Sequence, residues 1–302
     1  MRASSYKYNR ICAANSLIWR IALLWAAMGI TAPAAVLDDA ADAYANARYE
    51  KTVQLLSGKS GKSAAEAFLL GRAQFQLGDF DRAVQNFERA VSAEPTNSAH
   101  SNWLGKAQGM RAERANPFSA MGLARKARDA FESAVKLDPG NLEAVSDLFS
   151  YYIAAPGFLG GGIDKARTLA ETIRSVNAGE YAFLRGELAE KSNDYPAAEK
   201  FYQEAQAREP KKIGRWIDLA KFYTRRRMFD KADDALAKAK ALTPGAPRLL
   251  FDEANLLVRS ERDPRKARAL ITKYQTVPLT SDDPSPYDVR QLIEKLEKLE
   301  KK

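Results

Sequence analysis

The chain has 302 residues, with 47 basic and 38 acidic side chains and a formal net charge of +9. It holds one cysteine, Cys12, and one histidine, His100, which excludes an internal disulfide and a zinc site built from Cys and His ligands. No combination of residues predicts a catalytic site, so we expect no enzyme activity, no cofactor and no bound metal.

The first 34 residues carry four basic side chains and no acidic one, and they include an apolar run over residues 21–30. Ala32-Pro33-Ala34 then offers the pattern of small residues that a signal peptidase accepts. We therefore expect a signal peptide over residues 1–34 and an exported, periplasmic protein. The apolar stretch is shorter than the roughly 20 residues that span a bilayer, so no transmembrane span is expected after cleavage. An uncleaved anchor in the inner membrane and a mitochondrial presequence are the alternatives.

The stretch 64–97 predicts two short helices joined by a tight turn. Gly71 lies in the middle of the first helix, where a second helix can approach closely, and Gly78-Asp79-Phe80 makes the turn. Small and aromatic residues spaced three and four apart form one face of the second helix, and a proline ends it. These residues are Ala83, Phe87, Ala90 and Pro95.

The same spacing of small, large and small residues before a proline recurs along the chain. The further sets are Ala127, Phe131, Ala134 and Pro139, then Ala198, Tyr202, Ala205 and Pro210, then Ala232, Leu236, Ala239 and Pro244. Together these units resemble the tetratricopeptide repeat (TPR), a helix–turn–helix unit of 34 residues. The resemblance implies an all-α fold, a right-handed TPR solenoid of about six to seven helix–turn–helix repeats with a C-terminal capping helix.

The predicted repeats follow the signal peptide and fill most of the chain. They lie near residues 36–63, 64–97, 98–141, 142–176, 177–212, 213–246 and 247–275, and the predicted capping helix covers residues 285–301. That last helix begins at Ser285 and Pro286, which are typical of a helix N-terminus. We expect it to cover the exposed end of the solenoid, and a partner-binding or dimerising role is the alternative.

Two of the predicted repeats are longer than the others. Gly105 and Ala127 in the third repeat are 22 residues apart, whereas Gly71 and Ala83 in the second are 12 apart. The extra residues predict a lengthened loop around residues 110–122, which either forms a contact surface or has no role. In the fourth repeat, the glycine-rich loop 157–162 is expected to be a structural turn, with anion binding at the following helix as the alternative.

The TPR resemblance also implies that the first helix of each repeat lines a concave groove. Aromatic and charged side chains together there can hold an extended or helical segment of a protein partner. The basic side chains would favour an acidic segment. The candidate groove residues are Phe68, Arg72, Phe75, Asn102, Lys106, Phe183, Glu187, Lys221, Arg225, Arg248, Phe251 and Arg259.

We therefore expect a non-enzymatic scaffold or adaptor that binds a partner segment in the concave groove, in the bacterial envelope. The alternative is an envelope enzyme, or its accessory subunit, with a site in the expanded third and fourth repeats. The segment 211–302 is basic, but it also carries many acidic residues, and the export signal argues against a nucleic-acid partner. The oligomeric state stays open.

Overall fold

The computed structural model describes residues 33–58 and 62–301, so residues 1–32 of the predicted signal peptide lie outside the described residues. Within the described ranges the protein is built of helices without a strand, which confirms the predicted all-α fold. The helices are α2 (Pro33–Ala45), α3 (Tyr49–Ser57), α4 (Ala64–Gln76), α5 (Phe80–Ala93), α6 (Ser98–Arg114), α7 (Pro117–Leu137), α8 (Leu142–Ala154), η1 (Gly157–Leu159), α9 (Ile163–Thr172), α10 (Ala178–Lys191), α11 (Tyr195–Arg208), α12 (Ile213–Arg225), α13 (Phe229–Leu242), α14 (Pro247–Arg259), α15 (Pro264–Tyr274) and α16 (Pro286–Glu300).

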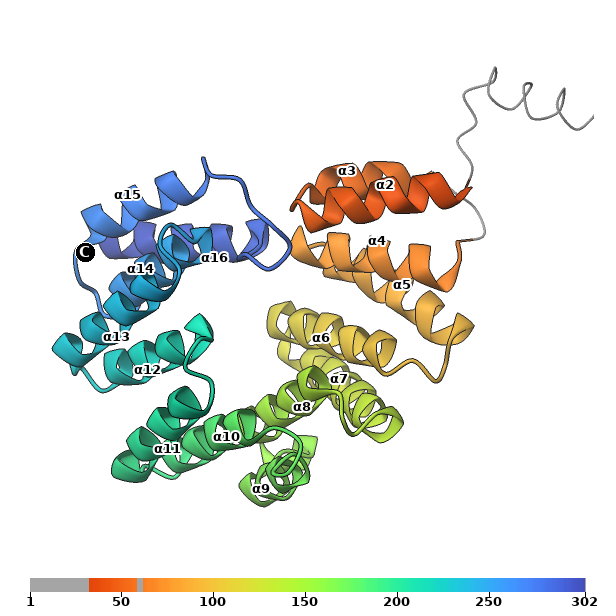
Figure 1. The fold of residues 1–302 in the computed structure, drawn as a ribbon. Coiled ribbons are helices and arrows are strands. Elements are labelled where there is room, and N and C mark those ends of the chain that lie inside the picture. The colour runs from red at the N-terminus through yellow and green to blue at the C-terminus, as the bar shows by residue number, and fades with distance from the viewer. Residues whose placement is uncertain (1–32, 59–61, 302) are drawn as a thin grey trace, which may run out of the picture.

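Consecutive helices form pairs that stack along a curved path, as Figure 1 shows. The first helices of the pairs (α4, α6, α8, α10, α12 and α14) lie toward the inside of the curve, and their partners lie outside. None of the described helices is both long and apolar enough to cross a membrane.

Short polar side chains begin most of these helices. Ser63 forms a capping box with Glu66 at the start of α4, and Asp79 accepts a bond from the backbone N–H of Arg82 at the start of α5. Ser285 and Asp288 form a second capping box on α16. Such caps satisfy backbone N–H groups that have no partner inside the helix, so they fix where each helix starts.

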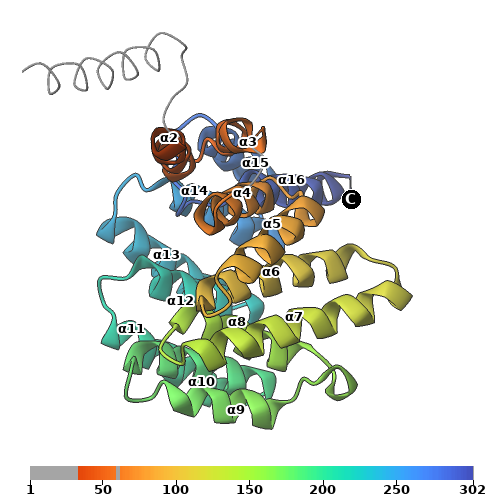
Figure 2. The same ribbon diagram turned by 90° about the vertical axis from the view of Figure 1, so that its right-hand side faces the viewer.

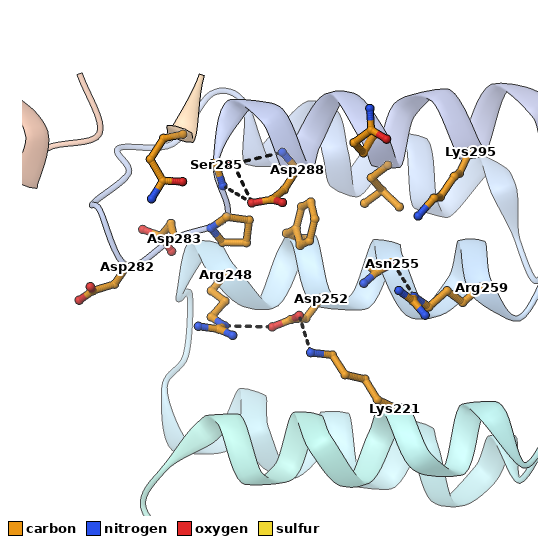
Figure 3. A pocket seen from close by; sticks show the side chains of 15 residues that line it. Lys221, Arg248, Asp252, Asn255, Arg259, Asp282, Asp283, Ser285, Asp288 and Lys295 are labelled. Carbon is orange, nitrogen blue, oxygen red and sulfur yellow. Dashed lines mark hydrogen bonds and ion pairs between the residues drawn. The ribbon is translucent and has the colours of Figure 1, made fainter. Parts of the chain in front are cut away.

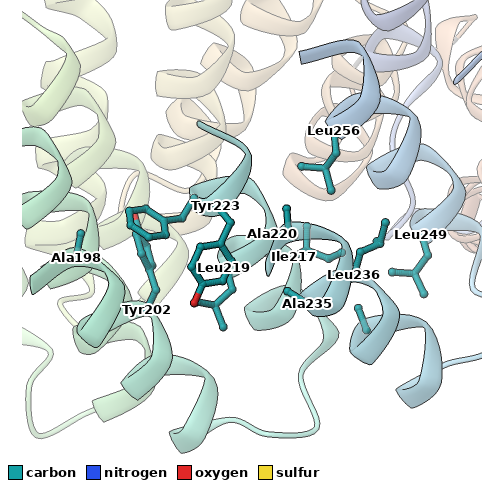
Figure 4. Close-up of a cluster of buried hydrophobic side chains, with 13 residues drawn as sticks. Ala198, Tyr202, Ile217, Leu219, Ala220, Tyr223, Ala235, Leu236, Leu249 and Leu256 are labelled. Carbon is teal, nitrogen blue, oxygen red and sulfur yellow. The ribbon is translucent and has the colours of Figure 1, made fainter. Parts of the chain in front are cut away.

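In the α4–α5 and α10–α11 pairs, a glycine of one helix lies against an aromatic ring of the other. A Cβ atom added at Gly71 would lie 2.7 Å from the ring of Phe87, and at Gly186 it would lie 2.9 Å from the ring of Tyr202. The buried cluster around Tyr202 continues from α11 through α12 and α13 to Leu249 and Leu256 of α14 (Figure 4). The apolar core is therefore a series of connected layers along the curve, as expected for stacked repeats.

The extra residues of the third repeat do not form the expected loop. They lengthen both helices instead, so that α6 has 17 residues and α7 has 21. Only Ala115 and Asn116 separate the two helices, because Asn116 caps α7 and Pro117 occupies its first turn. The expectation of a long loop was wrong, since the local sequence restarts a helix at once.

The glycine-rich segment of the fourth repeat is a compact turn fixed to α7. Gly160 and Gly162 have φ angles of 89° and 146°, which are favourable only for glycine. Arg128 of α7 donates to the carbonyl oxygen of Leu159, and Gly162 donates its N–H to the carbonyl of Tyr152. These contacts are those of a structural turn.

The curved path brings the C-terminal segment beside the N-terminal helices (Figures 1 and 2). The N–H of Ser281 donates to the carbonyl oxygen of Ala45 at 2.9 Å. Arg290 of α16 donates to the carbonyl oxygen of Leu77 at 2.6 Å, and the ring of Tyr287 lies 5.1 Å from that of Phe80. The predicted C-terminal helix thus packs on α14 and α15 and also reaches the second helix pair.

Candidate functional site

The candidate residues from the sequence lie on the inner face, defined here as the surface formed by the first helices α2, α4, α6, α8, α10, α12 and α14. Figure 1 shows that these helices follow one another around the inside of the curve. Side chains on neighbouring first helices are therefore one repeat apart in sequence and close in space.

Aromatic residues dominate the inner face around α4. Phe68 packs against Phe87 and the ring of His100, and Phe75 packs against Phe80 and Trp103. Both phenylalanines are half-buried, so they form the walls of this region as well as part of the local core.

Arg72 lies among these rings. Its guanidinium carbon is 4.4 Å from the ring centre of Tyr44 and 4.9 Å from that of Trp103, distances typical of cation–π contact. Its Nε is buried without a hydrogen-bond partner. Over residues 33–58 and 62–301, no carboxylate forms an ion pair with Arg72, so its charge is held by aromatic rings alone.

Carboxylates replace the aromatic rings at the next step along the inner face. Lys106 of α6 forms ion pairs with Glu143 and Asp147 of α8. The Nδ2 of Asn102, which is fully buried, donates to Asp147 at 2.8 Å. Burial raises the pKa of Asp147, although Lys106 and Asn102 oppose that rise. This pair of candidates therefore joins α6 to α8.

A denser ion-pair network joins α10 to α12. Arg225 donates two bonds to the carboxylate of Glu190, at 2.6 and 2.7 Å. Arg215, whose side chain is only 4% exposed, forms ion pairs with Glu180, Glu209 and Asp218. Its guanidinium also lies 5.0 Å from the ring of the candidate Phe183.

Glu187 stands beside this network without an ion pair or hydrogen bond to any described residue. Burial raises its pKa to about 7, and the carboxylate of Asp218 reinforces the rise while Arg225 opposes it. Its carboxyl group therefore changes charge near neutral pH.

The remaining candidates lie on α12 and α14. Lys221 and Arg248 share the buried carboxylate of Asp252, at 3.8 and 3.3 Å. The exposed side chain of Arg259 donates to Asn255 at 3.1 Å and forms no ion pair with a described carboxylate. Phe251 packs at a tilt against Tyr274, with ring centres 5.8 Å apart.

Two adjoining cavities open on the inner face at α12 and α14. The first, of about 380 Å³, is lined by α12, α14, α16, the segment 282–285 and Gln76 of α4 (Figure 3). The second, of about 350 Å³, shares Lys221, Asn255 and Arg259 with the first. It is also lined by Thr224, whose buried hydroxyl has no hydrogen-bond partner.

The first cavity has an acidic end and a basic end. Asp282, Asp283 and Asp288 lie toward one end in Figure 3, where Arg248 is paired with Asp252, and Arg259 and Lys295 lie at the other. The cavity therefore offers separate positions for a positive and a negative group of a ligand.

The twelve candidates form two groups, one on α4 and one around the cavities of α12 and α14, with four further candidates between them on α6 and α10. Phe68, Arg72 and Phe75 lie in the aromatic region, which is the part of the inner face around α4. Asn102 and Lys106 lie at the start of the ion-paired region, which runs along the inner face from α6 to α12. Phe183 and Glu187 lie on α10 outside the two cavities. The candidates that line the cavities are Lys221, Arg225, Arg248, Phe251 and Arg259.

Sequence reasoning missed the carboxylates that neutralise these cations. Glu143, Asp147 and Asp252 each pair with a candidate cation on the neighbouring first helix. A signal for such pairs is present, because Arg215 follows Glu180 by 35 residues and Arg225 follows Glu190 by 35 residues. Opposite charges about one repeat apart thus indicate ion pairs between neighbouring repeats.

The sole histidine of the chain belongs to the core. His100 is 4% exposed, its ring lies 4.6 Å from that of Phe68, and burial lowers its pKa. In the part of the chain that the structure describes, no cluster of His, Cys, Asp and Glu side chains could hold a metal ion.

Two family models of the tetratricopeptide repeat match this chain, one over residues 64–97 and one over residues 160–212. Among curated proteins, a stretch of 68 residues is 35% identical to the rhomboid protease GluP of Bacillus subtilis (strain 168). That stretch covers 22% of this chain but only 13% of the protease.

Solved TPR structures share the fold. A thermophilic TPR protein of Thermus thermophilus superposes with a TM-score of 0.52 and 19% identity, over 63% of this chain and 98% of that one. A tetratricopeptide repeat protein from Parabacteroides merdae superposes with a TM-score of 0.54 and 13% identity, over 87% of this chain and 97% of that one. These findings confirm the resemblance seen in the sequence. The chain therefore contains tetratricopeptide repeats and has the fold of the solved TPR proteins.

Proposed function

We propose that the protein is a non-enzymatic adaptor that binds a segment of a protein partner on its inner face. The observation that carries this proposal is the pair of cavities on α12 and α14. There the buried hydroxyl of Thr224 has no hydrogen-bond partner, and Arg259 forms no ion pair with a carboxylate of the described residues. A buried polar group without a partner is costly, and a ligand that supplies one recovers that cost.

The partner segment would follow the inner face from these cavities toward Arg72. Arg72 and Arg259 are the two candidate cations without an ion pair to a described carboxylate, whereas Lys106, Lys221, Arg225 and Arg248 each have at least one. An acidic residue of the partner would gain most at the two unpaired sites, because there it displaces no existing pair.

The partner would be met in the bacterial envelope if residues 1–34 act as the export signal that their composition predicts. Fractionation of cells and N-terminal sequencing of the purified protein would test this location. Recovery in the periplasm with a new N-terminus near Ala34 or Ala35 is the expected result, and an intact Met1 in the cytoplasm would contradict it.

The binding test is crosslinking capture from the envelope fraction with three forms of the protein. The first is wild type, the second carries Arg72→Glu and Arg259→Glu, and the third is a matched control with Arg125→Glu and Lys126→Glu. Arg125 and Lys126 lie on the helix α7 and outside the two cavities. A partner identified with wild type and the control, but lost with the second form, supports binding on the inner face.

Two results would contradict the proposal. A partner captured equally by all three forms would place the binding site away from Arg72 and Arg259. Thr224→Val then provides a finer test, because it removes the hydroxyl and keeps the shape of the side chain. Unchanged partner affinity of this variant would show that the second cavity is not occupied.

The alternative site in the expanded repeats corresponds to a groove of about 600 Å³ between α7, α8 and α9. Among its polar lining groups, the hydroxyl of Tyr152 donates to Glu132 at 2.8 Å. Burial and this bond raise the pKa of Tyr152, so the hydroxyl stays protonated at neutral pH. Tyr152 is therefore not an activated nucleophile, and binding on the inner face is the better supported function.

A further inference from the structure

The two ends of the described chain meet through a small set of contacts. We call the segment 276–290 the closing segment. It contributes the Ser281 N–H bond to Ala45, the Arg290 bond to Leu77 and the packing of Tyr287 on Phe80. Arg114 of α6 adds to this junction, since its guanidinium lies 4.4 Å from the ring of Phe80 and 4.6 Å from that of Tyr287.

The fit at this junction is close but local. Gly78 has a φ of 81°, and a Cβ atom there would lie 2.9 Å from the ring of Tyr287. In the described chain, however, no buried hydrophobic cluster contains residues from both sides of the junction. The cluster of α14–α16 ends at Leu296, and the clusters of α2–α4 hold none of its residues.

The rest of α16 is fixed independently of the junction. Val289, Leu292 and Leu296 are buried in the cluster of α14 and α15, on the opposite side from Tyr287 and Arg290. The junction can therefore open without removing α16 from the end of the solenoid, because separate side chains hold the two interfaces.

The closing segment also bounds the first cavity. Asp282, Asp283, Ser285 and Asp288 line this cavity from one side, and Gln76 of α4 lines it from across the junction. In the closed form, an extended segment that follows the inner face from α4 to α14 must pass beneath these residues. The closing segment itself carries three of the carboxylates that line this cavity.

We propose that residues 276–290 act as a latch that closes the solenoid into a ring and controls access of a partner segment to the inner face. The latch opens when the contacts of Ser281, Tyr287 and Arg290 are lost. The closing segment then moves away from the N-terminal helices, and the stacked helix pairs remain as one curved body with two free ends. This inference rests on the proposed binding function for its role, whereas the closed and open forms can be measured without a partner.

The first experiment tests whether closure exists in solution. Cys12→Ser removes the natural thiol, and Ala45→Cys with Ser281→Cys then places two thiols on residues joined by a backbone hydrogen bond, which lie within reach of a disulfide. Rapid formation of the intramolecular disulfide in the folded protein is expected. The control is a second pair of cysteines designed across α14 and α15, which should oxidise normally. If that control pair forms its disulfide but the thiols introduced by Ala45→Cys and Ser281→Cys stay reduced under mild oxidation, the proposal is overturned.

The second experiment tests whether the latch controls access. The variant Asn255→Cys in the Cys12→Ser protein places a thiol in the cavity. The measured quantity is the rate at which this thiol reacts with a maleimide that carries a polyethylene glycol chain of about 5 kDa, a size on the order of a small domain. Tyr287→Ala with Arg290→Ala should increase this rate about tenfold, as expected if the closed form dominates by about ten to one. The control is Glu297→Ala with Lys298→Ala, two exposed residues at the other end of α16.

The radius of gyration from X-ray scattering provides the companion measurement and should rise with the opened variant only. Arg290→Ala alone, which removes an exposed side chain, serves if the double variant does not unfold cooperatively. Equal labelling rates in the opened variant and the control would overturn the latch. A partner that fails to bind the inner face in the capture experiment would overturn the proposed function and leave the measured closure standing.

Discussion

Two positions along the inner face hold their cations in different ways. Arg72, near the N-terminal end, is surrounded by the rings of Tyr44, Phe68 and Trp103. Arg225, two helix pairs before the C-terminal helix, is held by two bonds to the carboxylate of Glu190. Both arginines occupy first helices, yet only one has its charge neutralised by the fold.

The difference shows that a cation in a repeat groove is not by itself a ligand site. A carboxylate on the next helix uses the same donors that a partner would need. Aromatic rings hold the guanidinium in place and leave those donors free. The neighbour one repeat away therefore decides whether a groove cation is available.

The largest effect should come from breaking the ion-paired region at its most buried member. Arg215→Met leaves the carboxylates of Glu180, Glu209 and Asp218 without their shared cation, and this should lower the free energy of unfolding by about 3–5 kcal/mol. Urea denaturation would measure the loss. Arg208→Met is the control, since Arg208 pairs with Glu204 on an exposed surface and its removal should cost less than about 1 kcal/mol.

In both the aromatic and the ion-paired region, a glycine of the first helix lies against a ring of the second helix. The same glycine substitution should therefore destabilise both helix pairs equally. Gly71→Ala and Gly186→Ala each push a Cβ atom into a ring, which should lower the free energy of unfolding by about 1–3 kcal/mol. Gly109→Ala meets no atom within 4 Å and should stabilise α6 by up to about 1 kcal/mol. Unequal losses at Gly71 and Gly186, measured by thermal unfolding, would show that the regions differ below their surfaces as well.

The ion-paired region should also respond to pH through Glu187. Its pKa is about 7 in the folded chain and lower in the unfolded chain, so the folded form binds the proton more tightly. The free energy of unfolding should therefore fall by about 2–3 kcal/mol as the pH rises from about 4.5 to 7, and level off above about pH 8. In Glu187→Gln this component of the fall should be absent.

The comparison to make is the difference between wild type and Glu187→Gln at each pH, because the other carboxyl groups contribute equally to both proteins. A difference that grows with pH up to about 7 supports the raised pKa. A difference that does not change with pH would show that Glu187 is well solvated.

The smallest expected effect is a difference between Arg72 and Arg225 in how salt changes their contributions to the free energy of unfolding. Arg72→Gln and Arg225→Gln should each lower the free energy of unfolding by about 0.5–1 kcal/mol in dilute buffer. In about 1 M salt the loss at Arg225 should shrink, because salt screens a partly exposed ion pair, and the loss at Arg72 should persist. Equal salt dependence in equilibrium unfolding would mean that Arg72 has a carboxylate partner in solution.

Local patterns made the helix pairs predictable. The spacing of Ala83, Phe87 and Ala90 and the position of Gly71 encode which faces of two adjacent helices meet, and the structure buries these residues together. The same holds for Ser285 and Pro286, since a cap acts on the helix that directly follows it.

Features that depend on the path of the whole solenoid were not predictable. The carboxylate that meets Lys106 is set by how α8 is rotated on α6, and the contact of Arg290 with Leu77 depends on the accumulated curvature of all repeats between them. The lengthened helices α6 and α7 were missed because the extra residues were treated as a loop, although Asn116-Pro117 is a strong start for a helix.

The ion pairs between first helices also give the repeats a fixed order. Glu180 of α10 accepts from Ser146 on the preceding first helix, α8, and from Arg215 on the following first helix, α12. Excising the α10–α11 unit would bring α12 next to α8, where Ser146 would replace Glu180 opposite Arg215. The apolar layers could close again, but the charges would no longer match, so this solenoid cannot be shortened or shuffled by whole units as an array of identical modules can.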